Sequence, residues 1–391
     1  MRVLIAPDCY GGTLTAAEAA EALAAGWRRG APTDELALVP LADGGPGFID
    51  AVASGTGGER VPVVVTGPLG EPVPAAILVV PTDAGPVAYV ESAHATGLHL
   101  VPVDRRDPTR TTSVGVGELV AAACELGARR VVVGLGGSGT NDGGAGLLAG
   151  LGMASPALRR GGGALAVLAD DDLADLAAAR GAVAGVDLVV AVDVDVPLLG
   201  LHGASAGFAP QKGATPEQAQ ELERALGHFA ALVAAQAPAT PAAGGLIPLS
   251  SGGPGSRWAQ LPGAGAAGGL GFALAVLGGR LLPGADVVAD AVGLDRAADA
   301  ADLLVTGEGT LDWQSLHGKV VAAVARRGLA RGLPVVVVAG QVALGRREWG
   351  AAGISGAYAV AEHAAEVPGA LADPAATLAA RAERVARTWS R

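Results

Sequence analysis

The stretch RVLIAPDCYGGTLTAAEAAEALAAGWRRG, residues 2–30, contains the structural unit from which we predict the fold. Arg2–Pro7 is a short apolar run typical of a β-strand, and a loop with Asp8 and two glycines follows it. A helix is expected to open at Thr15, because Thr15 and Glu18 have the spacing of a capping box, and to close at Gly30. The order strand, polar loop, Ala-rich helix indicates an α/β protein if it recurs along the chain.

The alternation does recur along the 391 residues. Apolar runs predict further strands at Val61–Thr66, Val87–Glu91, Arg130–Gly134, Val186–Val192, Asp302–Thr306, Pro334–Ala339 and Ile354–Val360. Ala-rich segments predict helices at Ala121–Ala128, Pro216–Ala235, Gly318–Arg327 and Ala375–Trp389, the last opened by Asp373 and Pro374. We therefore expect an α/β fold with a mainly parallel sheet.

The length predicts two domains, because it is about twice that of a typical domain. The runs Arg2–Pro7, Asp302–Thr306 and Pro334–Ala339 are almost uninterrupted apolar sequence, as strands covered on both faces are. We therefore expect the first and last strands of the chain to lie in one sheet.

The composition excludes some classes of function. The net charge of -11 argues against a surface that binds nucleic acid or an anionic membrane. Aromatic residues make up only 3% of the chain, so Ala, Val and Leu must build the core. The two cysteines, Cys9 and Cys124, are far apart and predict no disulfide framework, which is typical of a reducing compartment.

No targeting or membrane segment is expected. The start MRVLIAPD is too short an apolar run for a signal peptide. The uncharged stretch Trp258–Gly279 is rich in glycine and contains Pro262, so it favours a glycine loop followed by a buried helix over a membrane span. Ala234–Ser256, rich in Ala, Pro, Gly and Ser, is expected to be a long irregular excursion. We expect a cytoplasmic protein.

Polar, glycine-rich loops follow four of the expected strands, and ligands of open α/β sheets bind at the carboxyl ends of strands. These loops are Asp8–Gly12, GLGGSGTNDGGAG at residues 134–146, DVDVPL at residues 193–198, and TGEGTLDWQS at residues 306–315, which continues into HGK at residues 317–319. Together they predict one or more ligand sites.

The loop at residues 134–146 suits an anion such as phosphate or carboxylate. It offers many backbone N–H groups, the hydroxyls of Ser138 and Thr140, and Asn141. Asp142 would repel an anion, so it is expected to cap the next helix or to orient a neighbour. A sharp loop with a capped helix remains the alternative. The loop also fits GxGxxG, but no acidic residue follows at the dinucleotide-fold spacing before Asp170, which disfavours that interpretation.

Six acids and two lysines form a set that suits phosphoryl transfer, and the acids are Asp8, Asp43, Asp193, Asp195, Glu308 and Asp312. Of the 27 Lys and Arg residues, only Lys212 and Lys319 are lysines, and both stand next to glycine. Compact ammonium groups at these points suit phosphate oxygens. Any single Asp is more often a cap or a turn residue, so the prediction rests on the set.

Other signatures of catalysis are absent from the sequence. There is no GxxxxGK[ST] loop, because Val320 follows Lys319, and there is no protein-kinase signature. The six histidines do not have zinc-site spacing. Cys9 could be a nucleophile at a helix N-terminus or simply a small loop residue.

The loops together resemble those of the bacterial type 1 glycerate kinase family (glycerate 2-kinase). The matching segments run in order: IAPD with GTLTA (5–16), ADGGPG (42–47), TGPLGEPV (66–73), GLGGSGTNDGGAG (134–146), PQKGAT (210–215), GAGAAGGLG (263–271), and TGEG followed by DWQS and HGK (306–319). The resemblance implies ATP-dependent phosphorylation of D-glycerate with Mg²⁺, usually to 2-phosphoglycerate. The implied partners are ATP and a small hydroxy acid, and the oligomeric state, monomer or homodimer, stays open.

The resemblance also implies two α/β domains. A flavodoxin-like domain is expected from residues 1–70 and 285–391, with a second α/β domain inserted at 71–284. The candidate catalytic residues are Asp8, Asp193, Asp312 and Lys319, with Asp8 and Asp193 as candidate Mg²⁺ ligands. The candidate substrate- or nucleotide-binding residues are Asp43, Gly136, Gly137, Ser138, Thr140, Asn141, Lys212, Glu308 and Gln314. Which loops bind ATP and which bind glycerate is left open.

Several positions depart from the pattern of the family. The first loop reads APDCYGG, without the lysine usual in the family, and Val196 stands where DVxNPL has Asn. Losing a lysine removes a cation, and losing an Asn removes a donor and an acceptor. A diverged relative that acts on another hydroxy acid, or that only binds a ligand, is therefore the alternative hypothesis.

Overall fold

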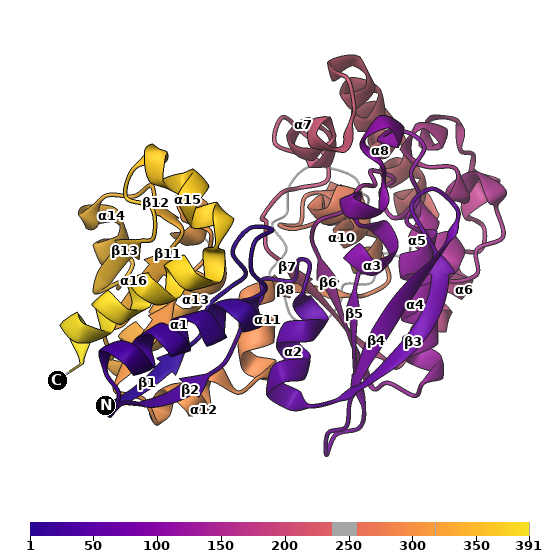
Figure 1. The fold of residues 1–391 in the computed structure, drawn as a ribbon. Coiled ribbons are helices and arrows are strands. Elements are labelled where there is room, and N and C mark those ends of the chain that lie inside the picture. The colour runs from indigo at the N-terminus through magenta and orange to yellow at the C-terminus, as the bar shows by residue number, and fades with distance from the viewer. Residues whose placement is uncertain (237–255, 317, 391) are drawn as a thin grey trace. The chain divides into compact units, whose positions relative to one another are not determined.

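A computed structural model describes residues 1–236, 256–316 and 318–390. The chain folds into two α/β units (Figure 1). The terminal unit comprises Met1–Asp43, Gly47–Gly57 and Pro283–Arg391, and the inserted unit comprises Gly44–Pro46 and Gly58–Leu282. Both chain ends thus build one domain, and the other lies between them in sequence.

The terminal unit is built on a parallel sheet of five strands in the order β2-β1-β9-β11-β13. Its strands are β1 (Arg2–Ile5), β2 (Glu35–Leu38), β9 (Leu303–Thr306), β11 (Val335–Ala339) and β13 (Gly356–Ala359). In order of appearance within the unit, this is the 2-1-3-4-5 order of flavodoxin-like folds. Val3 pairs with Leu303, which confirms that the first and last strands share a sheet.

Helices cover this sheet and show the expected local signals. They are α1 (Ala16–Gly30), α2 (Phe48–Thr56), α11 (Gly284–Ala291), α12 (Leu294–Asp299), α13 (Val320–Arg331), α14 (Arg346–Ala351), α15 (Val367–Ala372) and α16 (Pro374–Trp389). The capping box at Thr15 is present, and Asp373 caps α16. Helices α1 and α16 lie side by side (Figure 1), so closely that a Cβ at Gly26 would come 2.0 Å from the Ala379 carbonyl oxygen. Two short strands, β10 (Thr310–Leu311) and β12 (Gln341–Val342), pair beyond the main sheet.

The inserted unit is built on a mixed six-stranded sheet, β3-β4-β5-β6-β7-β8. Its strands are β3 (Glu59–Thr66), β4 (Pro72–Val80), β5 (Val87–Glu91), β6 (Arg130–Leu135), β7 (Asp187–Val192) and β8 (Arg280–Pro283). Strands β5, β6 and β7 are parallel, whereas β3, β4 and β5 are antiparallel neighbours. The TGPLGEPV segment forms the turn between β3 and β4. Residues 59–66, which the sequence analysis assigned to the flavodoxin-like domain, therefore pair within this second sheet.

The helices of the inserted unit surround a core rich in Ala, Val and Leu. They are α3 (Ala93–Thr96), α4 (Val114–Glu125), α5 (Ala145–Gly150), α6 (Leu176–Ala182), α7 (Ala204–Phe208), α8 (Pro216–Gln236), α9 (Ser256–Ala259) and α10 (Ala266–Val276). Helix α4 begins at Val114, well before the expected Ala121. Its opening sequence, VGVGELV, shows no clear helical period, so the sequence did not predict this part of the helix. None of the helices in the described ranges is long and apolar enough to cross a membrane.

The stretch Trp258–Gly279 folds as expected, as glycine-rich backbone followed by a buried helix. Gly268 has a φ of +72°, and a Cβ there would lie 2.0 Å from the Thr140 carbonyl oxygen, so only glycine fits against the loop after β6. Of the excursion expected at Ala234–Ser256, residues 237–255 lie outside the described residues, and the preceding ones complete α8.

Candidate active site

The terminal unit gathers carboxylates at the carboxyl ends of β1, β2 and β9. Asp8 follows β1, Asp43 lies beyond β2, and Glu308 follows β9. Because β1 and β9 are neighbours, their loops meet, and the Asp8 amide donates a hydrogen bond of 2.8 Å to the Gly307 carbonyl. Asp8 and Glu308 are each only 8% exposed. Three of the predicted site residues thus form one acidic cluster.

Asp8 and Glu308 of this acidic cluster hold their protons more tightly than free carboxyls do. Burial, together with the charges of Asp43 and Glu308, raises the pKa of Asp8, although the Cys9 amide opposes this by donating to Asp8 Oδ1 over 2.7 Å. Burial raises the pKa of Glu308 to about 7, against the opposing effects of Ser315 and Lys319. The buried Glu308 Oε1 has no hydrogen-bond partner among the described residues. A cation or a proton would therefore stabilise this cluster.

The segment after β10 contains a cation, Lys319, that acts on the acidic cluster, and a turn shaped by Asp312. Lys319 is the N-cap residue of α13, half-buried, and its charge lowers the pKa of Glu308. Asp312 Oδ1 accepts hydrogen bonds from the amides of Gln314 (2.8 Å) and Ser315 (3.3 Å), so it shapes the turn that precedes α13. Gln314 is exposed. Two predicted residues of this segment thus act on the buried Glu308 through their charges, because Lys319 lowers its pKa and Asp312 raises it.

The loop after β6 holds a buried lysine in the inserted unit. Lys212 is only 3% exposed, and its Nζ donates to Ser138 Oγ at 2.9 Å and to the Thr140 carbonyl at 2.7 Å. An ammonium carries three donors, so one remains beyond these two bonds. Burial lowers the pKa of Lys212 to about 7, and the charge of Asp142 opposes this. An anion that reached Nζ would stabilise the charged form.

Asp142 organises the glycine loop rather than facing a ligand. It is fully buried and accepts hydrogen bonds from the Ser113 amide (2.8 Å) and hydroxyl (2.8 Å to Oδ2), and from the Gly144 and Gly146 amides. Burial raises its pKa, although these four donors oppose the rise. The expectation that Asp142 caps the next helix or orients a neighbour is confirmed.

The remaining polar groups of this loop are buried as well. Asn141 Nδ2 donates to Ser205 Oγ at 3.0 Å, whereas Asn141 Oδ1 and Thr140 Oγ1 have no hydrogen-bond partner among the described residues. A buried polar atom without a partner costs free energy, unless a ligand or water satisfies it. These two atoms therefore mark places where a bound polar ligand would be stabilised.

A cavity of about 350 Å³ lies at the carboxyl ends of β6 and β7. The predicted residues that line it are Gly136, Gly137, Ser138, Asp193 and Lys212. Gly136 is required by packing, because a Cβ there would lie 2.5 Å from Gly45 Cα in the ADGGPG segment. A buried cation and a carboxylate thus face one cavity, which we call the acceptor cavity.

The comparisons with known proteins agree with these features. The model of the glycerate kinase family matches residues 3–390. The chain belongs to the glycerate kinase family. The glycerate kinase of Bacillus subtilis (strain 168) is 41% identical over 348 residues, which are 88% of this chain and 85% of the relative.

Two further proteins match this chain of the glycerate kinase family over most of its length. The glycerate 2-kinase of Escherichia coli (strain K12) is 39% identical over 348 residues, 88% of this chain and 86% of the relative. The crystal structure of a protein described as glycerate kinase 2 from Salmonella typhimurium LT2 superposes with a TM-score of 0.76 at 36% identity. That match covers 99% of this chain and 98% of the other.

The two candidate Mg²⁺ ligands lie in different units of this member of the glycerate kinase family. Among residues 1–236, 256–316 and 318–390, no group of three or more His, Cys, Asp or Glu is placed to hold a metal ion. Asp8 belongs to the terminal unit and Asp193 to the inserted unit. Mg²⁺ often uses only one or two carboxylates and keeps several waters, so the acidic cluster retains donors suited to it.

The positions that depart from the glycerate kinase family pattern are explained in part. Burial, with the charges of Asp8 and Asp43, raises the pKa of Cys9 to about 12, so its thiol stays protonated and makes a poor nucleophile. Val196 is half-buried, and its carbonyl accepts a hydrogen bond of 2.9 Å from the Gly265 amide. The loop at 196 therefore keeps a backbone role without an amide side chain.

Sequence reasoning missed two serines that support the site. Ser113 binds Asp142, and Ser205 binds Asn141. The small-residue segments TTSVG (111–115) and GASAG (203–207) contain them, and a serine two residues before a glycine was the available signal. Neither could be connected to the loop after β6 without the fold, because their partners lie 29 and 64 residues away.

Proposed function

We propose that this chain transfers the γ-phosphoryl group of ATP to a hydroxyl of D-glycerate and forms 2-phosphoglycerate. Membership of the glycerate kinase family supports this reaction, and so does the similarity to a glycerate kinase and a glycerate 2-kinase. The observation that carries the proposal is the acceptor cavity, which is lined by both Lys212 and Asp193. A hydroxy acid needs such a pair, because its carboxylate requires a cation and its hydroxyl an acceptor.

In this proposal, the substrate carboxylate binds the remaining N–H donor of Lys212. Asn141 Oδ1 and Thr140 Oγ1, both buried and without partners among the described residues, do not line the acceptor cavity, so we assign them no contact with the substrate. Asp193 accepts the proton of the attacking hydroxyl. The hydroxyl oxygen forms the new P–O bond, while the bond between the γ-phosphorus and the bridging oxygen of ATP breaks.

Negative charge on the transferred group requires cations in a site that excludes water. Lys319 is the candidate for this role in the terminal unit. Mg²⁺, when bound, would neutralise phosphate charge, and Asp8 in the acidic cluster is the ligand we assign to it, with Asp193 as the second candidate. The raised pKa of Asp8, caused by burial and by the charge of Asp43, fits a carboxylate that is stabilised by a nearby divalent cation.

A second hypothesis is the same chemistry on a different hydroxy acid. Val196, in the loop that follows Asp193, has an apolar side chain where the family resemblance expects an amide. A larger or less polar acid would then be preferred over glycerate, because a hydroxyl facing a valine loses a hydrogen bond.

The test is release of ADP in the presence of D-glycerate and a panel of other hydroxy acids that includes larger and less polar ones. Phosphorus NMR then identifies the product, because phosphate on C2 couples to one proton and phosphate on C3 couples to two. Turnover of D-glycerate with a doublet supports the proposal. Faster turnover of another acid supports the second hypothesis, and absence of turnover on every acid overturns both.

A matched pair of variants tests the role of the acceptor cavity. Asp193→Asn should lower kcat by about a hundredfold or more, since general-base catalysis contributes about 10²–10⁴-fold. Asp195→Asn changes an exposed acid two residues further along the same loop and should keep most of the activity. Equal activity of both variants would remove Asp193 from the reaction.

A further inference from the structure

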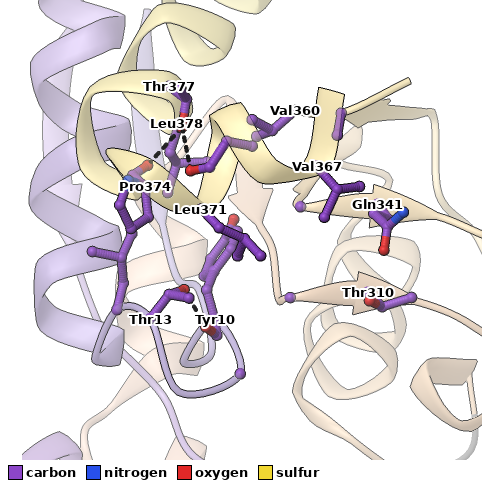
Figure 2. A pocket seen from close by; sticks show the side chains of 16 residues that line it. Tyr10, Thr13, Thr310, Gln341, Val360, Val367, Leu371, Pro374, Thr377 and Leu378 are labelled. Carbon is purple, nitrogen blue, oxygen red and sulfur yellow. Dashed lines mark hydrogen bonds between the residues drawn. The ribbon is translucent and has the colours of Figure 1, made fainter. Parts of the chain in front are cut away.

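A second cavity, of about 220 Å³, lies wholly within the terminal unit. It is formed by the loops after β1, β9, β11 and β13, together with α15 and α16. Figure 2 shows Tyr10 and Leu371 on one side of it and Thr310 and Gln341 on the other. Its volume is below the roughly 300–1,000 Å³ of pockets that enclose a drug-sized molecule, so it suits a single ring system.

The walls of this cavity combine apolar side chains with a polar edge. Leu14, Val360, Val367 and Leu378 contribute apolar surface, and Leu371, which is 56% exposed, adds more at the rim. Thr310 and Gln341 belong to the two-stranded sheet of β10 and β12. An edge strand presents backbone N–H and C=O groups, so the polar side can form hydrogen bonds with the edge of a flat ring. The apolar walls would cover the two faces of that ring.

The position of the cavity is one at which doubly wound folds bind ligands. The strand order of the terminal unit reverses between β1 and β9, because one half of the sheet grows from β1 to β2 and the other from β9 to β13. Ligands of open α/β sheets bind outside the carboxyl ends of the strands at this switch point. Tyr10 follows β1 and Gly309 follows β9, and both line the cavity.

The same two loops carry the acidic cluster. Tyr10 stands two residues after Asp8, and Gly309 directly follows Glu308. The Tyr10 hydroxyl donates to the Val338 carbonyl, which fixes its ring at the cavity wall. The charges of Glu308 and Asp8 add to burial in raising the pKa of Tyr10. The acidic cluster therefore acts on a residue of the cavity wall, and Lys319 acts electrostatically on Glu308.

We propose that this cavity binds the adenine ring of the phosphate donor, an inference that rests on the proposed kinase function. A purine has two apolar faces and an edge of donors and acceptors, which the apolar walls and the polar edge match. D-Glycerate fits poorly, because its carboxylate and hydroxyls would leave Leu14, Val360 and Leu378 without apolar partners. The polyphosphate of the donor then extends toward the loops of Asp8 and Glu308, where Lys319 is the nearby protein cation.

Calorimetric titration of the full chain with ADP, with adenosine and with D-glycerate tests this assignment. Ala370→Phe places a ring in the cavity, which Ala370 lines, whereas Ala372→Phe adds the same ring at an exposed position of the same helix that does not line it. We expect Ala370→Phe to raise the Kd for ADP and adenosine by about tenfold or more, the effect of removing a ring's burial. The Kd for D-glycerate should change less than about twofold, and Ala372→Phe should match the wild type.

Leu371→Asp provides a second variant, because Leu371 is exposed and its change should leave the fold intact. It should weaken adenosine binding in the same way. The inference is overturned if the wild type binds neither ADP nor adenosine. It is also overturned if Ala370→Phe and Leu371→Asp bind these ligands like the wild type, or if these two variants lose affinity for D-glycerate instead. If the two variants lose adenine binding but the wild type does not phosphorylate glycerate, the cavity assignment stands and the proposed function is overturned. If the two variants phosphorylate glycerate with an unchanged KM for ATP, the proposed function stands and the cavity assignment is overturned.

Discussion

The ammonium of Lys212 donates to the hydroxyl of Ser138 over 2.9 Å, across 74 residues of sequence. This bond, with the second one to the Thr140 carbonyl, holds the PQKGAT segment against the loop after β6. It also places the one buried lysine of the described residues at the acceptor cavity. The first prediction follows from this pair.

Lys212→Met should reduce kcat/KM for glycerate by about a hundredfold or more, because a buried charge-assisted contact to the substrate carboxylate is lost. Steady-state kinetics with D-glycerate measures the loss. The fold should survive, since Met fills most of the lysine volume, although the Thr140 carbonyl loses a donor at a cost of about 1–3 kcal/mol. Activity within a few-fold of the wild type would contradict the assignment of Lys212.

The same variant should change how stability depends on pH. Burial lowers the pKa of Lys212 to about 7 in the folded chain from 10.5, so between pH 7 and 10.5 the unfolded state binds more protons than the folded state. Stability contributed by this group therefore rises with pH across that window. The Tm difference between wild type and Lys212→Met should shift in favour of the wild type from pH 7 to pH 10, and a constant difference would contradict it.

Glu308→Gln should stabilise the protein at pH 8 while reducing its activity. Burial raises the pKa of Glu308 to about 7 from 4.5, so the folded state binds more protons between these values and stability falls as pH rises through them. Gln removes the buried charge, and its Tm advantage should be largest at pH 8 and absent at pH 4.5. The exposed Glu35→Gln serves as control. A Tm advantage that does not change with pH would argue against a raised pKa.

Lys319→Ala should lower kcat by about a hundredfold or more, because it removes a cation from the charge that develops on the transferred phosphoryl group. Its Tm should change by less than about 2 °C, since Lys319 is half-buried and caps α13 without a side-chain hydrogen bond. Arg347→Ala, an exposed cation of α14, is the control and should leave both quantities unchanged. An unchanged kcat in Lys319→Ala would remove this residue from the reaction.

The double variant Cys9→Lys and Val196→Asn should raise kcat/KM for glycerate by about tenfold or more, about 1.4 kcal/mol. Lysine at position 9 adds a cation beside Asp8, and asparagine at 196 adds a donor and an acceptor. The assay compares D-glycerate with the preferred acid of the hydroxy-acid panel. No gain in a robustly active protein would mean that other residues already perform these roles. If the double variant shows no gain and the wild type does not phosphorylate glycerate, the second hypothesis is favoured.

Local signals in the sequence were sufficient to predict helix starts, because a helix start depends on a few neighbouring residues. The Thr15–Glu18 capping box and the Asp373–Pro374 start predicted helices that the structure confirms. Strands β2, β4 and β8 of the two main sheets and the short strands β10 and β12 were not predicted, and β2 and β4 show why. ELAL is too short to show a period, and PVPAAILVV contains prolines that disfavour a strand, so only pairing with their neighbours defines them.

The sequence by itself determined the fold class, the family and the segments that carry polar chemistry, because glycine loops after apolar runs are visible within a few residues. Only the tertiary structure decided which of these residues meet. Lys212 reaches Ser138 and Asn141 reaches Ser205 because strand order brings loops 74 and 64 residues apart to one edge of a sheet. The same order turned Asp142 and Asp312 toward backbone amides, and it built a cavity from loops that no spacing in the sequence connects.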